Sequence, residues 1–277
     1  MRDPWALLGA GAADEGFIEN RRRLSLFGLS FELCLIPSRG GRAGVPSTEA
    51  PAFAVHPADR IRSEEALWRG DGLVLTPNRY PFFAPQLLAW PEAASPREAD
   101  RDFLERCFRL ADAAGASLLF NTVGASASIP LAHAHVLAAQ STVLAEIPLV
   151  RVGVGDGFSC WSPDPGGPAP FFAAVIEAVD PGLRAREVRR LADCRRTAAV
   201  NLISVGTKVW VVPRRQEVPA PEFPYAIGAG ELFGRFVFPK PDEFGAATQP
   251  ALEAAMTKAT VRCGAQQIAS LRRVWDF

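Results

Sequence analysis

The sequence carries no excess charge of either sign. Its 30 lysines and arginines balance 30 aspartates and glutamates over 277 residues. Proteins that bind a nucleic-acid backbone or an anionic membrane surface usually rely on a basic excess, so neither partner is expected. No apolar run is long enough to span a bilayer. The N-terminal apolar patch, interrupted by Pro4 and Gly9, lacks the continuous centre of a secretory signal.

Cysteine is scarce and scattered. The five cysteines form no C-x-x-C pair, which excludes the usual patterns of a zinc ribbon and of a thioredoxin-like redox site. Free thiols in a reducing, cytoplasmic compartment are therefore expected. We predict neither a metal nor a cofactor.

Only three histidines are present, and two of them, His133 and His135, lie one residue apart. They belong to the run 120–137, whose aliphatic and β-branched content predicts a strand. Side chains alternate across a strand, so the two histidines should share one face with Leu131. The opposite face should be packed and consists of Ala132, Ala134 and Val136.

A loop of small residues precedes the histidines, between Asn121 and Ser128. Its members, Gly124 and Ser126 among them, would let backbone N–H groups approach a bound anion, and a phosphate fits that description. One imidazole beside such a loop could attack phosphorus while the other donates to the phosphoryl oxygens. Two other interpretations stay open, because an H-x-H pair can hold zinc and a histidine pair can be purely structural.

The segment from Asn121 to His135 resembles the signature of the histidine-triad (HIT) superfamily, in which an Asn, a Gly-containing loop and a Ser precede alternating histidines on a strand. It looks more like the larger branch, which contains galactose-1-phosphate uridylyltransferase and the diadenosine tetraphosphate phosphorylases, than like the small nucleotide hydrolases. Ser128 matches the family serine and His133 the nucleophilic histidine. His135 stands where the larger branch generally has Gln and the hydrolases have His. Leu131 replaces the first histidine of the motif.

The resemblance implies an α+β fold of two HIT-like halves, each an antiparallel sheet with packed helices. Residues 1–154 would form the half that carries the histidines, and residues 155–277 the half that completes the nucleotide pocket. The Pro- and Gly-rich stretch 155–170 suggests this boundary. Asn121 and Asn201 occur at similar strand positions, which hints at a duplicated half.

Further binding residues are expected at two turns. Residues 72–91 predict two strands around a connection containing Pro and Asn, and in the resembling family an Asn followed by a basic residue lies there beside the nucleotide. Asn78 and Arg79 are therefore candidates for binding sugar or phosphate, although Asn also favours turns by itself. Residues 199–215 predict another strand pair, where Arg214 could donate to a phosphate or could simply be an exposed arginine.

Helical patterns surround these segments. A helix is plausible within residues 11–30. Ser95 provides the N-cap of a capping box, and the apolar face of the helix that follows continues to Ala114. The remaining helices are expected at residues 171–179, 181–192 and 249–273.

On this resemblance, the chain is expected to be a nucleotidyltransferase of the phosphorylase type. His133 would attack the α-phosphorus of a nucleoside polyphosphate or nucleotide-sugar, and phosphate or a sugar phosphate would then accept the nucleotidyl group. An unperturbed imidazole, with a pKa of about 6.5, is mostly neutral at cytoplasmic pH and can act as the nucleophile. Ser128 would donate near the leaving group, and His135 with the loop N–H groups would stabilise charge on the phosphoryl oxygens. Asn121 would hold the loop or contact the sugar.

Three alternatives remain at this point. Water as the acceptor would make the protein a HIT-type nucleotide hydrolase. The missing motif histidine at Leu131 is compatible with a nucleotide-binding protein that has no turnover, and a zinc-dependent hydrolase would use the histidine pair as ligands. Family members are often dimers, so the resemblance also implies a homodimer.

Overall fold

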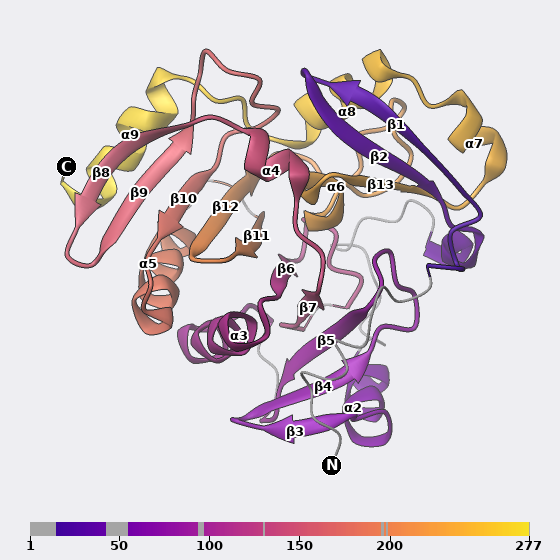
Figure 1. The fold of residues 1–277 in the computed structure, drawn as a ribbon, viewed down its shortest axis with the longest axis horizontal. Coiled ribbons are helices and arrows are strands. Elements are labelled where there is room, and N and C mark those ends of the chain that lie inside the picture. The colour runs from indigo at the N-terminus through magenta and orange to yellow at the C-terminus, as the bar shows by residue number, and fades with distance from the viewer. Residues whose placement is uncertain are drawn as a thin grey trace.

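The computed structural model describes residues 15–42, 55–93, 97–129, 131–194, 197 and 199–276 (Figure 1). Within these ranges the chain is an α+β protein with a ten-stranded antiparallel sheet and a separate three-stranded sheet. The predicted fold class is therefore confirmed. No helix in this part of the chain combines the length and apolar character needed to cross a membrane.

The ten-stranded sheet consists of two halves with the same strand topology. In each half, three strands form a meander, a helix follows, and a strand pair returns so that its second strand lies beside the third strand of the meander. The first half contains β3 (Trp68–Gly70), β4 (Leu73–Pro77), β5 (Gln86–Pro91), α3 (Arg101–Ala114), β6 (Ser117–Asn121) and β7 (Ala134–Leu137). The second contains β8 (Leu149–Gly155), β9 (Phe158–Pro163), β10 (Ala174–Glu177), α5 (Pro181–Asp193), β11 (Ala199–Val205) and β12 (Lys208–Arg214).

The halves meet where β6 pairs with β11, and Asn121 lies opposite Asn201 in that pairing. The similar strand positions of the two asparagines are thus explained by the repeated topology. Strand β8 pairs with β9, so the second half begins at Leu149, within the residues assigned above to the N-terminal half. The short helix α4 (Thr142–Glu146) connects the two halves.

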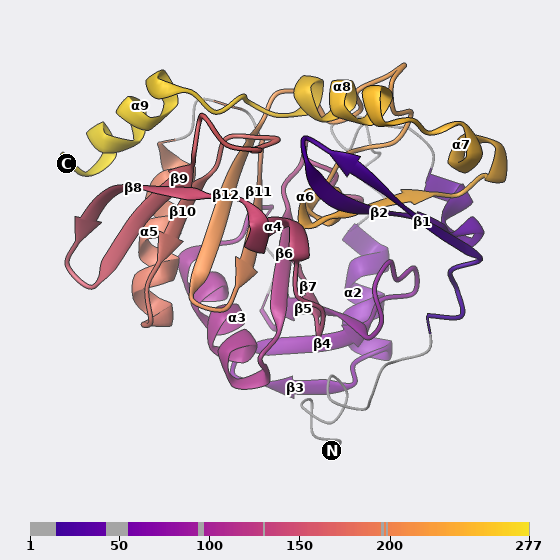
Figure 2. The ribbon, with the colours of Figure 1, turned by 45° about the horizontal axis from the view of Figure 1, so that its top comes forward.

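Two layers cover the large sheet. Helices α3 and α5 pack on one face, and their buried side chains form a core with the apolar residues of the strands beneath them. On the other face lies the small sheet of β1 (Asn20–Leu26), β2 (Leu29–Leu35) and β13 (Arg235–Phe238). Helices α7 (Pro241–Ala246), α8 (Gln249–Ala259) and α9 (Ala265–Trp275) follow one another along one side of the molecule (Figure 2).

The prediction of a helix within residues 11–30 is wrong, because residues 20–35 form the β1–β2 hairpin. Burial alternates along the second part of β1, where Leu24 and Leu26 turn inward, which is the period of a strand. Phe27 and Gly28, with φ of 53° and 83°, form the turn. Arginines at successive positions obscured this alternation in the sequence.

The helix expected from Ser95 begins later. Helix α3 starts at Arg101, and the Asp100 side chain caps it by accepting a hydrogen bond from the backbone N–H of Phe103 at 2.8 Å. Ser95 itself lies outside the described residues. Asp is as good an N-cap as Ser, and Asp100 stands directly before the apolar face of the helix. Gly115 ends the helix in the left-handed region, with φ of 61°.

Three other segments differ from expectation. The boundary stretch 155–170 contains strand β9, and residues 171–179 contain strand β10 in place of a helix. Strand β10 is buried on both faces, so its sequence shows no alternation that would distinguish it from a buried helix. The final helix is divided into α8 and α9, because Thr260 leaves the helix to make a β-bridge with Arg214.

The thiols provide a test of this packing. Cys34, Cys107 and Cys160 are buried, and burial raises the pKa of Cys34 and of Cys160 to about 12. Cys194 is exposed at the end of α5. Because the thiolate is the reactive form, we expect a maleimide to label Cys194 within minutes and the three buried thiols only after unfolding. Peptide mass spectrometry in buffer and in urea checks this, and rapid labelling of Cys107 in buffer would contradict the packing of α3.

Candidate active site

The two histidines lie at the start of strand β7, between β5 and β6. The strand begins at Ala134, so His133 directly precedes it. The two imidazole rings lie together, with their centroids 5.3 Å apart, on the face that also carries the small sheet. Ala132, Ala134 and Val136 pack into the core beneath α3. The predicted separation into a histidine face and a packed face is therefore confirmed.

The tautomer of His133 is determined by a backbone carbonyl. Its Nδ1 lies 2.8 Å from the carbonyl oxygen of Leu131. A carbonyl oxygen only accepts, so Nδ1 carries the proton and the lone pair of the neutral ring is on Nε2. The ring stacks on Trp90 at 4.8 Å, and the Trp90 indole N–H donates to Thr76 Oγ1 at 3.0 Å. Stacking and hydrogen bond together hold His133 in one orientation.

Leu131, which stands in place of the first motif histidine, contributes its backbone to this arrangement. Its side chain packs against a small apolar cluster of Val74, Leu88 and Trp90. The group that orients His133 is the main-chain carbonyl, which every residue possesses. A leucine at this position therefore preserves the hydrogen bond that orients His133.

His135 is held by a different partner. Its Nδ1 lies 2.8 Å from Nε2 of Gln86, the first residue of β5. Phe82 contacts the ring edge-to-face with a centroid distance of 5.5 Å. Both histidines are largely buried, with exposed fractions of 4% for His133 and 8% for His135.

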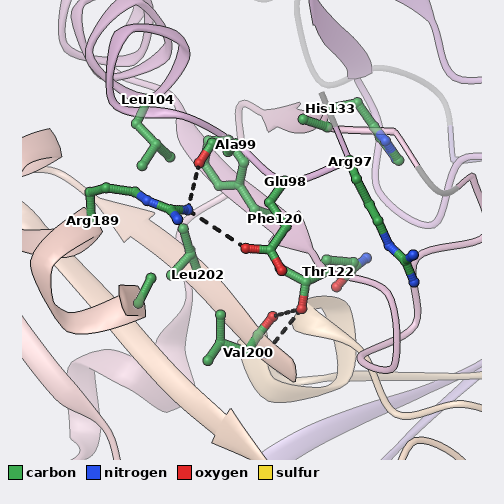
Figure 3. A pocket seen from close by; sticks show the side chains of 13 residues that line it. Arg97, Glu98, Ala99, Leu104, Phe120, Thr122, His133, Arg189, Val200 and Leu202 are labelled. Carbon is green, nitrogen blue, oxygen red and sulfur yellow. Dashed lines mark hydrogen bonds and ion pairs between the residues drawn. The ribbon is translucent and has the colours of Figure 1, made fainter. Parts of the chain in front are cut away.

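A small pocket lies beside His133 (Figure 3), with a cavity volume of about 20 Å³. Apolar side chains of α3, β6 and β11 form much of its wall: Leu104, Phe120, Val200 and Leu202. Arg97 and His133 lie on one side, and Arg189 on the other. The pocket therefore combines an apolar surface with two cations, of which Arg97 lies on the side of His133.

The two arginines of the pocket differ in their partners. Arg189 donates to the carbonyl oxygen of Ala99 at 3.2 Å and forms ion pairs with Asp193 at 2.5 Å and with Glu98 at 3.6 Å. Arg97 is exposed, and the described part of the chain gives it neither a hydrogen bond nor an ion pair. Its guanidinium is thus the cation that can bind an incoming anion without losing a protein partner.

Asn121 joins the pocket to the second half of the sheet. Its Oδ1 accepts hydrogen bonds from Asn201 Nδ2 at 2.7 Å and from the backbone N–H of Ala229 at 2.9 Å, at the start of helix α6 (Ala229–Phe233). Thr122 beside it exchanges two hydrogen bonds with the backbone of Val200, at 2.8 and 2.9 Å. The pocket wall is therefore built from both halves of the sheet.

The small-residue loop has the conformation that its composition allows, with φ of 86° at Gly124 and 73° at Ser126. The backbone N–H of Ser126 donates to the buried Glu217 carboxylate at 2.6 Å. A side-chain anion thus occupies this N–H, where a substrate phosphate was expected. Ser128 is exposed.

Arg214 is not at the surface of the pocket. It is 3% exposed and donates to Asn201 Oδ1 and to the carbonyl oxygens of Ile227, Gln216 and Ala259, at distances between 2.5 and 3.1 Å. Burial lowers its pKa to about 10, and the charges of Glu231 and Glu217 partly oppose this shift. In place of the expected phosphate, Arg214 has protein acceptors, and through Asn201 it supports Asn121.

Asn78 and Arg79 occupy the turn between β4 and β5. Asn78 Oδ1 accepts from the backbone N–H of Tyr80 at 3.1 Å, which is a local turn contact, while its Nδ2 is buried without a hydrogen-bond partner among the described residues. Arg79 is paired with Glu65 at 2.5 Å, and its side chain is 67% exposed. The structure therefore gives both residues local partners and leaves one donor of Asn78 unassigned.

Sequence reasoning missed Gln86, Trp90 and Arg97. Gln86 was visible as one polar residue at the start of an apolar strand, but its partner lies on another strand. Across the described ranges there is no cluster of three or more His, Cys, Asp or Glu side chains that could hold a metal ion.

No protein-family model matches the sequence, and no curated protein matches it either. Among solved structures, the chain is similar to yeast Ap4A phosphorylase Apa2, with 14% identity, a TM-score of 0.63, and coverage of 92% of this chain and 95% of that chain. It has the Ap4A phosphorylase fold. The same yeast enzyme in complex with Ap4A gives a TM-score of 0.63 at 14% identity, covering 91% and 94% of the two chains. Its complex with AMP gives 0.62 at 14% identity, covering 92% and 93%. The resemblance to the larger branch of the HIT superfamily is thereby confirmed at the level of the fold.

Proposed function

We propose that this chain is a nucleotidyltransferase of the phosphorylase type that forms a covalent nucleotidyl-histidine on His133. The observation that carries the proposal is the Leu131 carbonyl on His133 Nδ1, which leaves the lone pair of this ring on Nε2. His133 also borders the pocket described above. The similar yeast enzyme has been crystallised with Ap4A and with AMP, which makes dinucleoside polyphosphates the first substrate class to test.

The reaction would proceed by two displacements. His133 Nε2 attacks the α-phosphorus, an N–P bond forms, and the bond from phosphorus to the bridging oxygen breaks, so that the leaving phosphate takes the electron pair. The Nδ1 proton stays on the ring, where the Leu131 carbonyl stabilises the positive charge of the substituted imidazole. An acceptor oxygen then attacks phosphorus, and the electron pair of the N–P bond returns to Nε2.

The charges around the pocket indicate which molecule accepts the nucleotidyl group. Of the described residues that line the pocket, Glu98 is the one carboxylate, and it is paired with Arg189. Water must lose a proton to a base as it attacks, whereas a phosphate oxygen is already anionic. This favours inorganic phosphate, or a sugar phosphate, over water. The hydrolase remains the second candidate, because His135 stands where the small hydrolases have His.

The other site residues receive proposed roles that follow their positions. Arg97 binds the phosphate of the leaving group or acceptor, and Asn121 shapes the pocket wall. Ser128, Gly124 and Ser126 belong to the loop that would lie beside the leaving group. Arg214 supports Asn121 through its hydrogen bond to Asn201.

At the β4–β5 turn, the unassigned Nδ2 of Asn78 is the donor that a sugar hydroxyl could use. Arg79 is retained as a contact for a distal phosphate. The roles assigned to the two halves, a homodimer and a cytoplasmic location stay predictions.

Intact-protein mass spectrometry tests the proposal. The protein is mixed with dinucleoside polyphosphates and with nucleotide-sugars and quenched without acid, since the expected N–P bond is acid-labile. We expect an added nucleoside monophosphate on the wild type, which disappears when phosphate is supplied, with release of a nucleoside diphosphate. Release of the monophosphate irrespective of added phosphate would support the hydrolase. Product formation without any adduct would contradict the covalent mechanism.

Arg97 offers a separate prediction. In Arg97→Gln, we expect KM for the phosphate-bearing substrate to rise about tenfold or more, because one charge-assisted contact is lost, while kcat changes little. Steady-state kinetics at fixed ionic strength measures both constants. Arg101→Gln is the matched control, since it removes an exposed arginine four residues away that does not line this pocket. An equal rise in KM for both variants would show that the arginines affect substrate binding through the overall positive charge of this surface, and not through a direct contact of Arg97.

A further inference from the structure

Gln86 is a buried polar residue whose amide makes three hydrogen-bond contacts. It is 6% exposed at the start of β5, where the strand pairs with β7. Its Oε1 accepts hydrogen bonds from the backbone N–H groups of Phe82 at 2.9 Å and Phe83 at 3.3 Å. Its Nε2 lies 2.8 Å from Nδ1 of His135. A buried amide with these three contacts has one strongly preferred orientation.

That orientation follows from the chemistry of its partners. Backbone N–H groups can only donate, so the oxygen of the Gln86 amide must face Phe82 and Phe83. The amide nitrogen therefore faces His135 and donates to Nδ1. An imidazole nitrogen that accepts a hydrogen bond carries no proton, so neutral His135 has its proton on Nε2.

The neighbouring histidine is in the opposite state. The Leu131 carbonyl places the proton of His133 on Nδ1 and the lone pair on Nε2. Two imidazoles with centroids 5.3 Å apart thus present a lone pair from one Nε2 and an N–H from the other. These are the two groups that an attack on a phosphorus atom requires, a nucleophile and a donor to the phosphoryl oxygen.

We propose that Gln86 is a positioning residue that fixes the Nε2–H tautomer of His135 and thereby makes this histidine a hydrogen-bond donor to the substrate phosphoryl group. The tautomer follows from the hydrogen bonds alone, whereas the donor role rests on the proposed function. Because the Gln86 oxygen is held by two backbone N–H groups, the amide cannot turn over to accept from Nδ1 without leaving both donors unpaired.

A substitution by Glu separates this role from a structural one. In Gln86→Glu, one carboxylate oxygen can still accept from Phe82 and Phe83, so the turn before β5 keeps its hydrogen bonds. The other carboxylate oxygen takes the place of the amide nitrogen that donated to His135. Because this oxygen can only accept, it favours a proton on Nδ1 of His135. The matched control is Gln140→Glu, which adds the same charge at an exposed position of the same chain.

The decisive measurement is the long-range ¹H–¹⁵N spectrum of the full-length protein labelled at histidine, which reports which ring nitrogens carry protons. Only three histidines occur, so His56→Gln and His133→Gln assign the signals. In the wild type we expect His135 protonated on Nε2 and His133 on Nδ1. Gln86→Glu should move the His135 proton to Nδ1, and Gln140→Glu should leave both rings unchanged.

Kinetics provides the second readout. We expect kcat of nucleotidyl transfer to fall on the order of 100-fold in Gln86→Glu, with a melting temperature close to that of the control, because one donor to the transition state is lost. A wild-type His135 protonated on Nδ1 would overturn the inference even if nucleotidyl transfer is observed. The expected tautomers without any transfer would refute the proposed function and leave the assignment of Gln86 intact.

Discussion

Replacing His133 by Gln is expected to lower kcat for nucleotidyl transfer by at least about 10⁴-fold, because the nucleophile is removed and the Nδ1 lone pair of the neighbouring His135 is engaged by Gln86. Gln is close to His in size and keeps a polar group against the Leu131 carbonyl, so Trp90 and the pocket wall should keep their positions although the ring stack is lost. Single-turnover experiments with radiolabelled nucleotide measure the loss directly. Binding of the nucleotide, measured by calorimetry, should change by less than about tenfold.

This pair of measurements separates the main alternatives. Wild-type turnover that is lost in His133→Gln with binding retained is the pattern of a covalent catalyst. Binding without turnover in both proteins is the pattern of a nucleotide-binding protein, which the leucine at position 131 left open. His56→Gln serves as the control, since His56 lies far from the run 120–137 in the sequence. A variant that keeps more than about a tenth of the wild-type rate would place the nucleophile elsewhere.

The histidine strand could be predicted because its signal is local. Alternation over a few residues determines which side chains share a face, and the structure places His133 and His135 together on one face, with Ala134 packed on the other. The topology of the two halves followed from the family resemblance and not from periodicity. Where periodicity was absent, as in the fully buried strand β10, the prediction of a helix was wrong.

The partners of the histidines could not be predicted, because each depends on a pairing between distant segments. Gln86 meets His135 across two strands that are 49 residues apart in sequence, and the contact exists only once β5 pairs with β7. Arg214 illustrates the converse. An arginine after Pro213 looked exposed in sequence, but the return of the chain at Thr260 covers it and supplies acceptors from four segments.

Arg214 therefore leads to the largest expected effect on stability. In Arg214→Met, the aliphatic volume is largely kept, but the acceptors of Asn201, Ile227, Gln216 and Ala259 lose their donor inside the protein. Each buried acceptor left unpaired costs about 1–3 kcal/mol, and removing a buried charge offsets part of that loss. We expect the free energy of unfolding to fall by about 3 kcal/mol. Thermal and urea unfolding measure this, with a decrease in Tm of about 6–12 °C.

Arg215→Met is the matched control, because the next residue carries the same side chain at an exposed position. Its stability should change by less than about 0.5 kcal/mol. The Arg214 variant should also weaken nucleotide binding, since Asn201 then loses the contact that orients it toward Asn121, a residue of the pocket wall. Equal stability of the two variants would contradict the buried network. Loss of binding in Arg214→Met without loss of stability would instead assign the guanidinium to the substrate, as the sequence first suggested.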